Sequence, residues 1–358
     1  MKLVFIYATS QDAAPGTEWR FIHIAHAMKR SGVHIIHNIC LESLLQGVEP
    51  YENICLDADL IIMQAIFSQT SLPVIQHLKA QGKIVLLDLE DRSNFNWTIL
   101  DESKGYHPFR EAVEEIETAL RIADGGILPF ASSLARWNGY TRYHVIPSYI
   151  DLENLMSIKQ VEHEEIVVGW HQGLVRNQPE ALVWLEKFLL RVCELRPNVR
   201  FLPLAVKESE LRDWPIAISK RFLPPEISNQ PWPNPLGWVD IGLVPIFDCS
   251  TESLSRINTL EYMALKIPWI GSEMGSNFDL RSHGWLVDNT YGSWERILLD
   301  MIDHFHIYQR DSVWGPYVYG ISQGVEENLD RIIRTFLQII ESAEAEREAG
   351  YGKAYFGR

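Results

Sequence analysis

The chain has 358 residues, of which 46% are hydrophobic and 22% are charged, and its formal net charge is −15. These proportions are typical of a globular protein, and the length favours two domains over one core. The negative charge argues against non-specific nucleic-acid binding, which needs a basic face that replaces counterions on the phosphate backbone. It also argues against a strongly cationic membrane patch, and no apolar run approaches the length of a membrane span.

The cysteines and the first residues indicate the cellular compartment. Cys40, Cys55, Cys193 and Cys249 are scattered, with no CxxC pair and no His at metal-ligand spacing. We therefore expect reduced thiols in a cytoplasmic protein. Residues 1–10 carry one Lys and a short apolar run that leads into a loop, which predicts a first β-strand and no signal peptide.

The first half of the chain alternates short apolar runs with amphipathic stretches. Its predicted strands are residues 2–8, 34–39, 59–64, 83–89 and 125–129, and its predicted helices are 18–32, 74–82 and 110–125. The first helix carries Phe21, Ile24, Ala25 and Met28 on one stripe and ends at Gly32. Strands that alternate with helices of this length imply βαβ units and a parallel sheet.

A linker separates this half from a second alternating region. Residues 144–155 predict the last strand and turn of the first half, and the charged residues 156–165 have no apolar period. The alternation then restarts, with strands at 165–173, 198–206, 240–246, 268–270 and 284–289 and helices at 178–197, 257–265, 293–311 and 324–348.

The sequence therefore predicts an α/β protein in which one doubly wound, Rossmann-like architecture occurs twice. The predicted domains are residues 1–155 and 164–320, followed by a C-terminal helix at 321–345 and a tail at 346–358. Two such domains enclose a cleft between their strand ends, where we expect the ligand. The fold alone does not fix the function, because epimerases, phosphorylases and binding proteins use the same layout.

The most informative segment is residues 238–272, WVDIGLVPIFDCSTESLSRINTLEYMALKIPWIGS. It predicts a buried strand, a polar loop, a short amphipathic helix and a second apolar strand, with Glu261 on the loop side of the helix. Loops at the carboxyl ends of parallel strands bring together backbone N–H groups and helix N-termini, which bind anionic ligands. This segment is thus the predicted centre of a binding site.

The same segment resembles the pattern aDIGL.P…S.iK.lEYmAlgiPvi of glycosyltransferases of the GT-B fold, family 4 and its relatives. The matching residues are Asp240, Ile241, Gly242, Leu243, Pro245, Ser255, Ile257, Leu260, Glu261, Tyr262, Met263, Ala264, Leu265, Ile267 and Pro268. Residues 88–97, 122–137, 144–153, 166–173 and 274–302 resemble further segments of that family in the same order. The resemblance implies a GT-B fold, in which the C-terminal helix at 321–345 returns to the first domain. It also implies transfer of a sugar, with retention, from a nucleotide-diphosphate donor to an acceptor hydroxyl.

The resemblance also implies roles for particular residues. Donor binding is expected of Glu261 on the ribose, of Gly173, Arg176 and Arg256 around the diphosphate, of His171 in the donor loop, and of Ser250 beside Glu252 near the donor sugar. Asp88 and Asp91 are expected on the acceptor side, as base or hydroxyl ligand. Each has a plainer reading as well: Glu261 can serve as a helix-dipole partner, Gly173 as a turn glycine and Arg256 as a solvated arginine.

Three positions depart from the family pattern. Leu254 and Asn258 stand where two lysines are common, Trp170 stands in place of an arginine, and eight residues separate Glu252 from Glu261 where seven are usual. A dianionic diphosphate needs cationic or N–H partners. Arg256 and Arg176 are the candidates, because Arg suits bidentate phosphate contacts.

The acidic residues 88–91, DLED, can also be read as a DxD-like site for Mg²⁺ or Mn²⁺. A second Rossmann-like half with its own ribose glutamate disfavours that interpretation, so no metal and no cofactor is expected. Two other function classes remain: a nucleotide-sugar epimerase, and a non-catalytic donor-binding or partner subunit, suggested by the missing lysines.

The expected partners are a nucleotide-sugar donor and a glycan, lipid-linked or small-molecule acceptor, with no nucleic acid. A lipid-linked acceptor would require peripheral contact with the inner face of a membrane.

Overall fold

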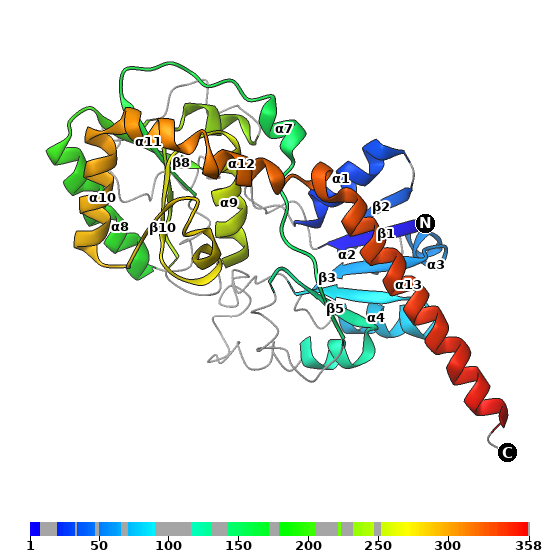
Figure 1. The fold of residues 1–358 in the computed structure, drawn as a ribbon. Helices are drawn as coiled ribbons and strands as arrows, with labels where there is room; N and C mark the ends of the chain where they lie inside the picture. Colours follow the sequence, from blue (N-terminus) through cyan, green and yellow to red (C-terminus); the bar gives the residue numbers. More distant parts are fainter. Residues whose placement is uncertain are drawn as a thin grey trace.

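The computed structural model describes residues 1–7, 20–32, 34–46, 50–65, 71–89, 116–130, 142–171, 179–204, 221–222, 232–246 and 252–356. The described strands form two separate parallel sheets, one in each lobe of the molecule (Figure 1). The strands of the first sheet lie within residues 1–155 and those of the second within 164–320. This is the twofold α/β architecture that the alternating pattern predicts.

The first sheet has the strand order β2-β1-β3-β4-β5-β6. Its strands are β1 (Lys2–Tyr7), β2 (Ile35–Cys40), β3 (Leu60–Gln64), β4 (Val85–Asp88), β5 (Gly125–Leu128) and β6 (Tyr143–Val145). The helices of this lobe whose bounds are described are α1 (Phe21–Ser31), α2 (Leu41–Leu45), α3 (Tyr51–Leu56) and α4 (Ser71–Ala80), and residues 116–122 are also helical. Strands β3 and β4 are buried along their whole length, because helices cover both faces of a doubly wound sheet.

The predicted apolar stripe of α1 is confirmed. Phe21, Ile24, Ala25 and Met28 are fully buried, and the helix ends where Gly32 adopts a left-handed φ of 67°. Glycine takes this conformation without steric cost. The stripe packs on the sheet and on the C-terminal helix, so this side of the first core is shared by residues from both ends of the chain.

The second sheet has the order β11-β10-β9-β7-β8. Its strands are β7 (Ile166–His171), β8 (Val199–Leu204), β9 (Ile241–Val244), β10 (Trp269–Ser272) and β11 (Trp285–Val287). The helices around it are α7 (Leu152–Met156), α8 (Pro179–Leu195), α9 (Glu252–Ala264), α10 (Tyr291–Asp303), α11 (Phe305–Ser312) and α12 (Gly315–Ser322), with the 3-10 turns η6 (Asn234–Trp238) and η8 (Gly275–Leu280).

Helix α13 (Val325–Phe356) returns to the first lobe and lies along it, as the sequence predicts (Figure 1). Phe336 is fully buried there, with its ring centroid 6.5 Å from that of Phe21 in α1. The helix continues through residues 346–356, which the sequence assigns to a tail. These residues follow a run of Glu and Ala, which are strong helix formers, and Glu346 pairs with Arg142 beside the first sheet.

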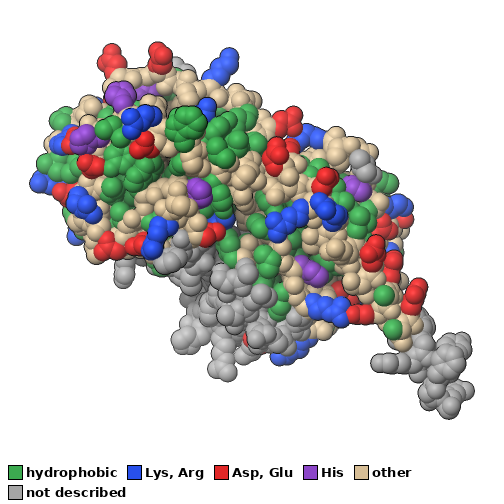
Figure 2. Space-filling view, in the orientation of Figure 1, with side chains coloured by type: hydrophobic (Ala, Val, Ile, Leu, Met, Phe, Trp, Pro, Cys, Tyr) green, Lys and Arg blue, Asp and Glu red, His purple; other side chains and the backbone are tan. Residues whose placement is uncertain are grey.

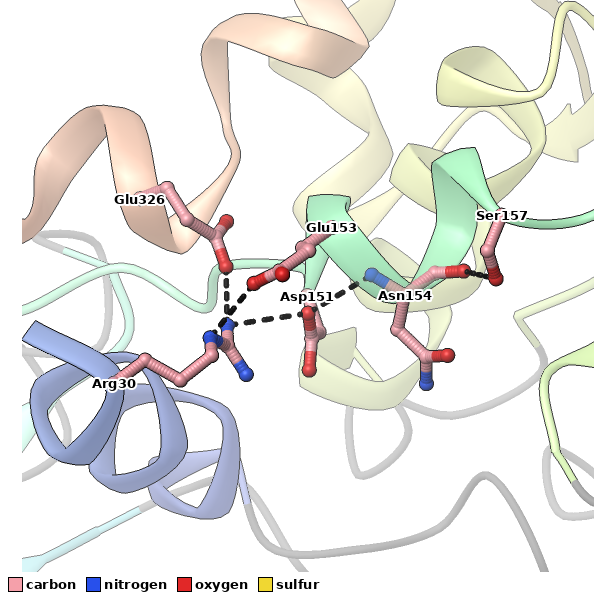
Figure 3. Close-up of polar contacts among 6 residues, drawn as sticks. All are labelled: Arg30, Asp151, Glu153, Asn154, Ser157 and Glu326. Atoms are coloured by element: carbon pink, nitrogen blue, oxygen red, sulfur yellow. Dashed lines mark hydrogen bonds and ion pairs between the residues drawn. The ribbon is translucent and has the colours of Figure 1, made fainter.

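The chain crosses between the lobes twice, and the two crossing segments are hydrogen-bonded to each other. The N–H of Ile150 donates to the carbonyl of Gln323 at 3.2 Å, and the N–H of Val325 donates to the carbonyl of Ile150 at 2.9 Å. Arg30 of α1 binds both segments through Glu326 at 2.5 Å, Glu153 at 2.8 Å and Asp151 at 3.4 Å (Figure 3). One guanidinium therefore ties the first lobe to both crossings.

The carboxylate of Asp151 also caps the short helix between the lobes. It accepts a hydrogen bond from the N–H of Asn154 at 3.2 Å, and the hydroxyl of Ser157 donates to the carbonyl of Asn154 at 2.7 Å (Figure 3). An Asp at this position satisfies an orphan N–H of the first helical turn.

On the face shown in Figure 2, acidic, basic and hydrophobic side chains are interspersed over both lobes. No helix in the described part of the chain combines the length and the apolar character that crossing a bilayer requires.

Candidate donor site at the carboxyl ends of the second sheet

Helix α9 is fixed over the second sheet by a close contact with glycine. A Cβ atom at Gly242 of β9 would lie 2.4 Å from the ring of Tyr262, so only glycine leaves room for that ring. The hydroxyl of Tyr262 donates to the carbonyl of Gly169 in β7 at 3.3 Å. Tyr262 is fully buried, and burial raises its pKa well above the usual value. This anchor sets the height and rotation of the helix that carries Glu261.

The preceding residue, Glu261, lies beside the last residue of β7. The Nε2 atom of His171 is 3.9 Å from the Oε2 atom of Glu261, and both side chains are buried. A distance of 3.9 Å is too long for a hydrogen bond. The structure thus brings together two residues that the sequence places in the donor site.

His171 is a neutral imidazole. It is 1% exposed, and burial lowers its pKa from 6.5 to about 3, because the charged form loses its hydration. Neither ring nitrogen has a hydrogen-bond partner among the residues that the structure describes. The imidazole of His171 packs edge-on against Trp232, with the two ring centroids 4.7 Å apart.

Asn258 lies one helical turn before Glu261 in the position of a family lysine. It is 1% exposed, and its amide nitrogen and oxygen both lack partners within the described residues. An unsatisfied buried polar group costs about 1–3 kcal/mol, so native proteins keep few of them. His171 and Asn258 therefore bring neutral polar atoms to the part of the second domain that holds the Glu261 carboxylate.

Hydrogen bonds at the ends of β9 and β10 fix the start of the loop that leads into α9. The N–H of Ile246 donates to the hydroxyl of Ser272 at 2.8 Å, and that hydroxyl donates to the Asn289 oxygen at 2.6 Å. The amide nitrogen of Asn289 returns a hydrogen bond to the carbonyl of Ile246 at 2.6 Å. The strand ends are therefore rigid where the predicted loop begins.

Arg256 lies on α9, where its partners are protein side chains. Its Nη1 atom donates to both carboxylate oxygens of Asp279, at 2.8 and 2.9 Å, and its Nη2 atom donates to the hydroxyl of Tyr319 at 2.8 Å. The guanidinium carbon also lies 5.5 Å from the ring centroid of Phe130, which follows β5 in the first domain. Arg256 is therefore buried at the boundary between the domains.

In the first domain, Asp88 lies at the carboxyl end of β4 and is occupied by a buried ion pair. Arg20 donates from Nη2 to Asp88 Oδ1 at 2.5 Å and from Nε to the same carboxylate at 3.2 Å, and both side chains are fully buried. Arg20 also donates to the carbonyl of Ile146. The carboxylate of Asp88 is therefore paired with Arg20, whereas a base or hydroxyl ligand on the acceptor side has to face the acceptor.

The other predicted site residues are placed only in part. Glu252 begins α9, but its side chain lies outside the described part. Asp91, Gly173, Arg176 and Ser250 also lie outside the described residues. Within the described ranges, no three His, Cys, Asp or Glu side chains lie close enough together to hold a metal ion.

Sequence reasoning missed Arg20, Asp279 and Tyr319. Arg20 lies 68 residues from Asp88, and Tyr319 lies 63 residues from Arg256, so no local pattern links either pair. The one available signal was Asp279, which lies in a segment that resembles the family but whose partner the resemblance does not name.

Solved structures with the same fold are found although no family model and no curated protein matches the sequence. Sucrose-phosphate synthase from Thermosynechococcus elongatus aligns with 96% of this chain and 100% of its own, with a TM-score of 0.66 and 12% identity. Anabaena HepE in complex with UDP and glucose aligns with 94% of this chain and 99% of its own, with a TM-score of 0.62 and 15% identity.

An epimerase shares the fold as well. UDP-GlcNAc 2-epimerase from Neisseria meningitidis, bound to UDP-GlcNAc, aligns with 94% of this chain and 100% of its own, at a TM-score of 0.54 and 13% identity. At these identities the likeness shows the fold: the chain has the GT-B arrangement of two Rossmann-like domains with a returning C-terminal helix.

Proposed function

We propose that the protein is a glycosyltransferase that binds a nucleotide-diphosphate sugar at the carboxyl ends of the second sheet and transfers the sugar to an acceptor hydroxyl. The observation that carries this proposal is the buried group of Glu261, neutral His171 and Asn258. It lies where parallel α/β sheets bind nucleotides. Neighbours of this fold were crystallised with UDP, UDP-glucose and UDP-GlcNAc.

Each residue of this group has a defined task in the proposal. The carboxylate of Glu261 accepts hydrogen bonds from the ribose hydroxyls, and a charged acceptor makes such bonds roughly twice as strong as neutral ones. His171 and Asn258 supply neutral donors and acceptors to the same ligand. Because His171 stays uncharged, it recognises the donor without adding charge beside Glu261.

Arg256 is the proposed cation for the diphosphate, together with Arg176 and the backbone at Gly173. A leaving diphosphate gains negative charge in the transition state, and a cation held in place beforehand stabilises it. Ser250 and Glu252 are proposed to lie near the donor sugar and Asp91 on the acceptor side. Asp88 is proposed to support the acceptor side through its pair with Arg20.

The finer features of the reaction are also proposals. We infer retention of configuration, no requirement for a metal ion, and a cytoplasmic site of action on a glycan, lipid-linked or small-molecule acceptor. A lipid-linked acceptor adds peripheral contact with the inner face of a membrane.

A nucleotide-sugar epimerase is the second candidate, because UDP-GlcNAc 2-epimerases are among the structures that share this fold over its full length. Such an enzyme acts on the same donor but needs no acceptor hydroxyl. The two candidates therefore differ in whether the sugar is transferred to an acceptor hydroxyl, with the nucleoside diphosphate as the leaving group.

The test incubates the purified chain with UDP-glucose or UDP-GlcNAc and follows the phosphorus and anomeric proton signals by NMR. UDP release that depends on an added acceptor supports transfer, and a new sugar epimer without acceptor supports epimerisation. The matched variants are Glu261→Gln and Glu344→Gln, the latter on an exposed position of α13. We expect only Glu261→Gln to abolish turnover. Absence of donor binding by the wild-type chain would overturn both candidates.

A further inference from the structure

We propose that Asp279 and Tyr319 are positioning residues that hold the Arg256 guanidinium at the domain boundary for the diphosphate of the donor. This inference rests on the proposed function, in which Arg256 contacts that diphosphate. Three separate parts of the chain meet at the guanidinium: Asp279 in η8, Tyr319 in α12 and Phe130 after β5. These three contacts hold the long Arg256 side chain in one place.

The orientation of the guanidinium matters because it is planar and its five N–H donors have fixed directions. Asp279 engages Nη1 and Tyr319 engages Nη2, so the two partners together define the plane. Asp279 also supplies a counter-charge to a cation that is 5% exposed. A buried cation without such a partner is unfavourable, and its side chain would turn toward water.

Tyr319 reaches Arg256 because α12 packs against α9 at a glycine. A Cβ atom at Gly320 would lie 2.7 Å from the backbone nitrogen of Ala264 and 2.7 Å from the Cβ atom of Met263. Glycine therefore permits the close approach that brings the neighbouring Tyr319 hydroxyl within 2.8 Å of Nη2. This contact results from helix packing, so no local sequence pattern predicts it.

A second layer fixes the Tyr319 ring itself. His283 stacks on it with ring centroids 4.3 Å apart and an interplanar angle of 17°. The carbonyl of His283 accepts a hydrogen bond from the indole nitrogen of the fully buried Trp269 at 3.2 Å. Tyr319 is thus supported from the sheet, and its hydroxyl has a defined place.

The Phe130 contact links this arrangement to the first domain. Phe130 is the described residue of that domain whose ring lies against the Arg256 guanidinium, and a cation over an aromatic face is an attractive contact. Helix α12 then leads directly into the crossing segment at Gln323–Gly324, which is bonded to Ile150. Arg256 therefore has contacts on both sides of the boundary across which donor and acceptor would meet.

The test compares a nucleoside diphosphate with its nucleoside. The wild-type chain is titrated with UDP, GDP, dTDP and ADP by calorimetry, and the diphosphate that binds is used with Tyr319→Phe and Asp279→Asn. We expect each variant to weaken diphosphate binding about tenfold, a loss of charge-assisted contact. Binding of the corresponding nucleoside, measured by ligand-observed NMR, should not change, because the nucleoside lacks the diphosphate.

Controls separate positioning from a general structural effect. Tyr317→Phe removes a hydroxyl from the same helix, where that ring contacts Lys266, and should leave the diphosphate affinity unchanged. In an Arg256→Gln background, Tyr319→Phe and Asp279→Asn should cause no further loss, since coupled residues are not additive. Equal weakening of nucleoside and diphosphate, or additive losses in the Arg256→Gln background, would overturn the inference.

The two levels of the proposal fail in different ways. If the wild-type chain binds a diphosphate and the Tyr319 and Asp279 variants bind it equally well, this inference is wrong and the proposed function stands. If the wild-type chain binds none of the four diphosphates, the proposed function falls and this inference falls with it.

Discussion

The imidazole of His171 and the carboxylate of Glu261 lie 3.9 Å apart in the buried end of the second sheet, yet the imidazole is neutral. A charged pair at this distance would attract, but the cost of burying the imidazolium outweighs that attraction. The arrangement leaves one negative charge beside two neutral polar side chains, His171 and Asn258. This combination suits hydroxyl groups of a ligand better than a second anion.

Stability should fall in mild acid because of His171. Its pKa in the folded chain, about 3, is lower than the 6.5 of the unfolded chain. The unfolded form therefore binds a proton that the folded form excludes, so this contribution is complete above pH 6.5 and is lost as the pH falls toward 3. The expected slope is about 1.4 kcal/mol per pH unit within that window.

The measurement is the thermal midpoint at pH 7.5, 6 and 5 for the wild-type chain and His171→Gln. We expect a shallower decline for the variant. Some decline should remain, because burial also lowers the pKa of His23 to about 4. Parallel curves for both proteins would show that folding does not lower the pKa of His171.

The buried pair of Arg20 and Asp88 should be costly to break. Asp88→Asn leaves the Arg20 charge buried without its carboxylate, and we expect a loss of about 3–5 kcal/mol in the free energy of unfolding. The matched control is Asp57→Asn, which breaks the exposed pair with Lys2 and should change the free energy of unfolding little, because solvent screens that pair. Chemical denaturation of both variants provides the comparison, and similar small losses would mean that the Arg20 pair contributes little.

The two glycines Gly320 and Gly292 should respond to alanine in opposite directions. Gly320→Ala places a methyl group 2.7 Å from the backbone of α9, so overpacking should cost about 1–3 kcal/mol. Gly292 lies in α10 with nothing within 4 Å of an added Cβ atom, so alanine there should stabilise the chain by about 0.4–1 kcal/mol. Thermal midpoints that move in the same direction for both variants would contradict the packing of α12 on α9.

Arg30 should control the local stability of the two crossings. Its removal leaves Asp151, Glu153 and Glu326 without their shared cation (Figure 3). In Arg30→Gln we expect faster hydrogen exchange at the amides of Ile150 and Val325, with little change in the global melting temperature, because the guanidinium is 39% exposed. Arg334→Gln, on an exposed position of α13, is the control. Unchanged exchange in Arg30→Gln would show that the crossing is held by its backbone bonds alone.

Local pattern was sufficient for the parts of the fold that repeat. The buried stripe of α1 and the alternation of strands and helices follow from apolar periodicity and length, whereas the return of α13 to the first lobe follows from the family resemblance. The region after α10 is different. The sequence predicts one helix over 293–311. In the structure this helix is interrupted at His304, which separates α10 from α11, and α12 follows. Gly315 and Pro316 begin α12, where a proline fits the first helical turn, and packing on α9 outweighs the low helix propensity of Gly320.

Residues of the candidate site could be predicted where they lie in segments that resemble a family. Glu261 and His171 belong to segments that resemble a family, and the structure places them side by side. The partners of Arg256 and Asp88 come from distant parts of the chain and are set by how helices pack, which no local pattern specifies. The roles of the site residues themselves remain predictions for the binding experiments.

The central claim is that Glu261 belongs to a nucleotide-sugar donor site in the second domain. The most direct test is a calorimetric titration of UDP, GDP, dTDP and ADP into the wild-type chain, Glu261→Gln and the exposed control Glu344→Gln, in buffer with a metal chelator. We expect saturable binding of one diphosphate by the wild type and the control, and at least tenfold weaker binding by Glu261→Gln. Equal binding by Glu261→Gln and wild type, or no binding of any diphosphate, would contradict it.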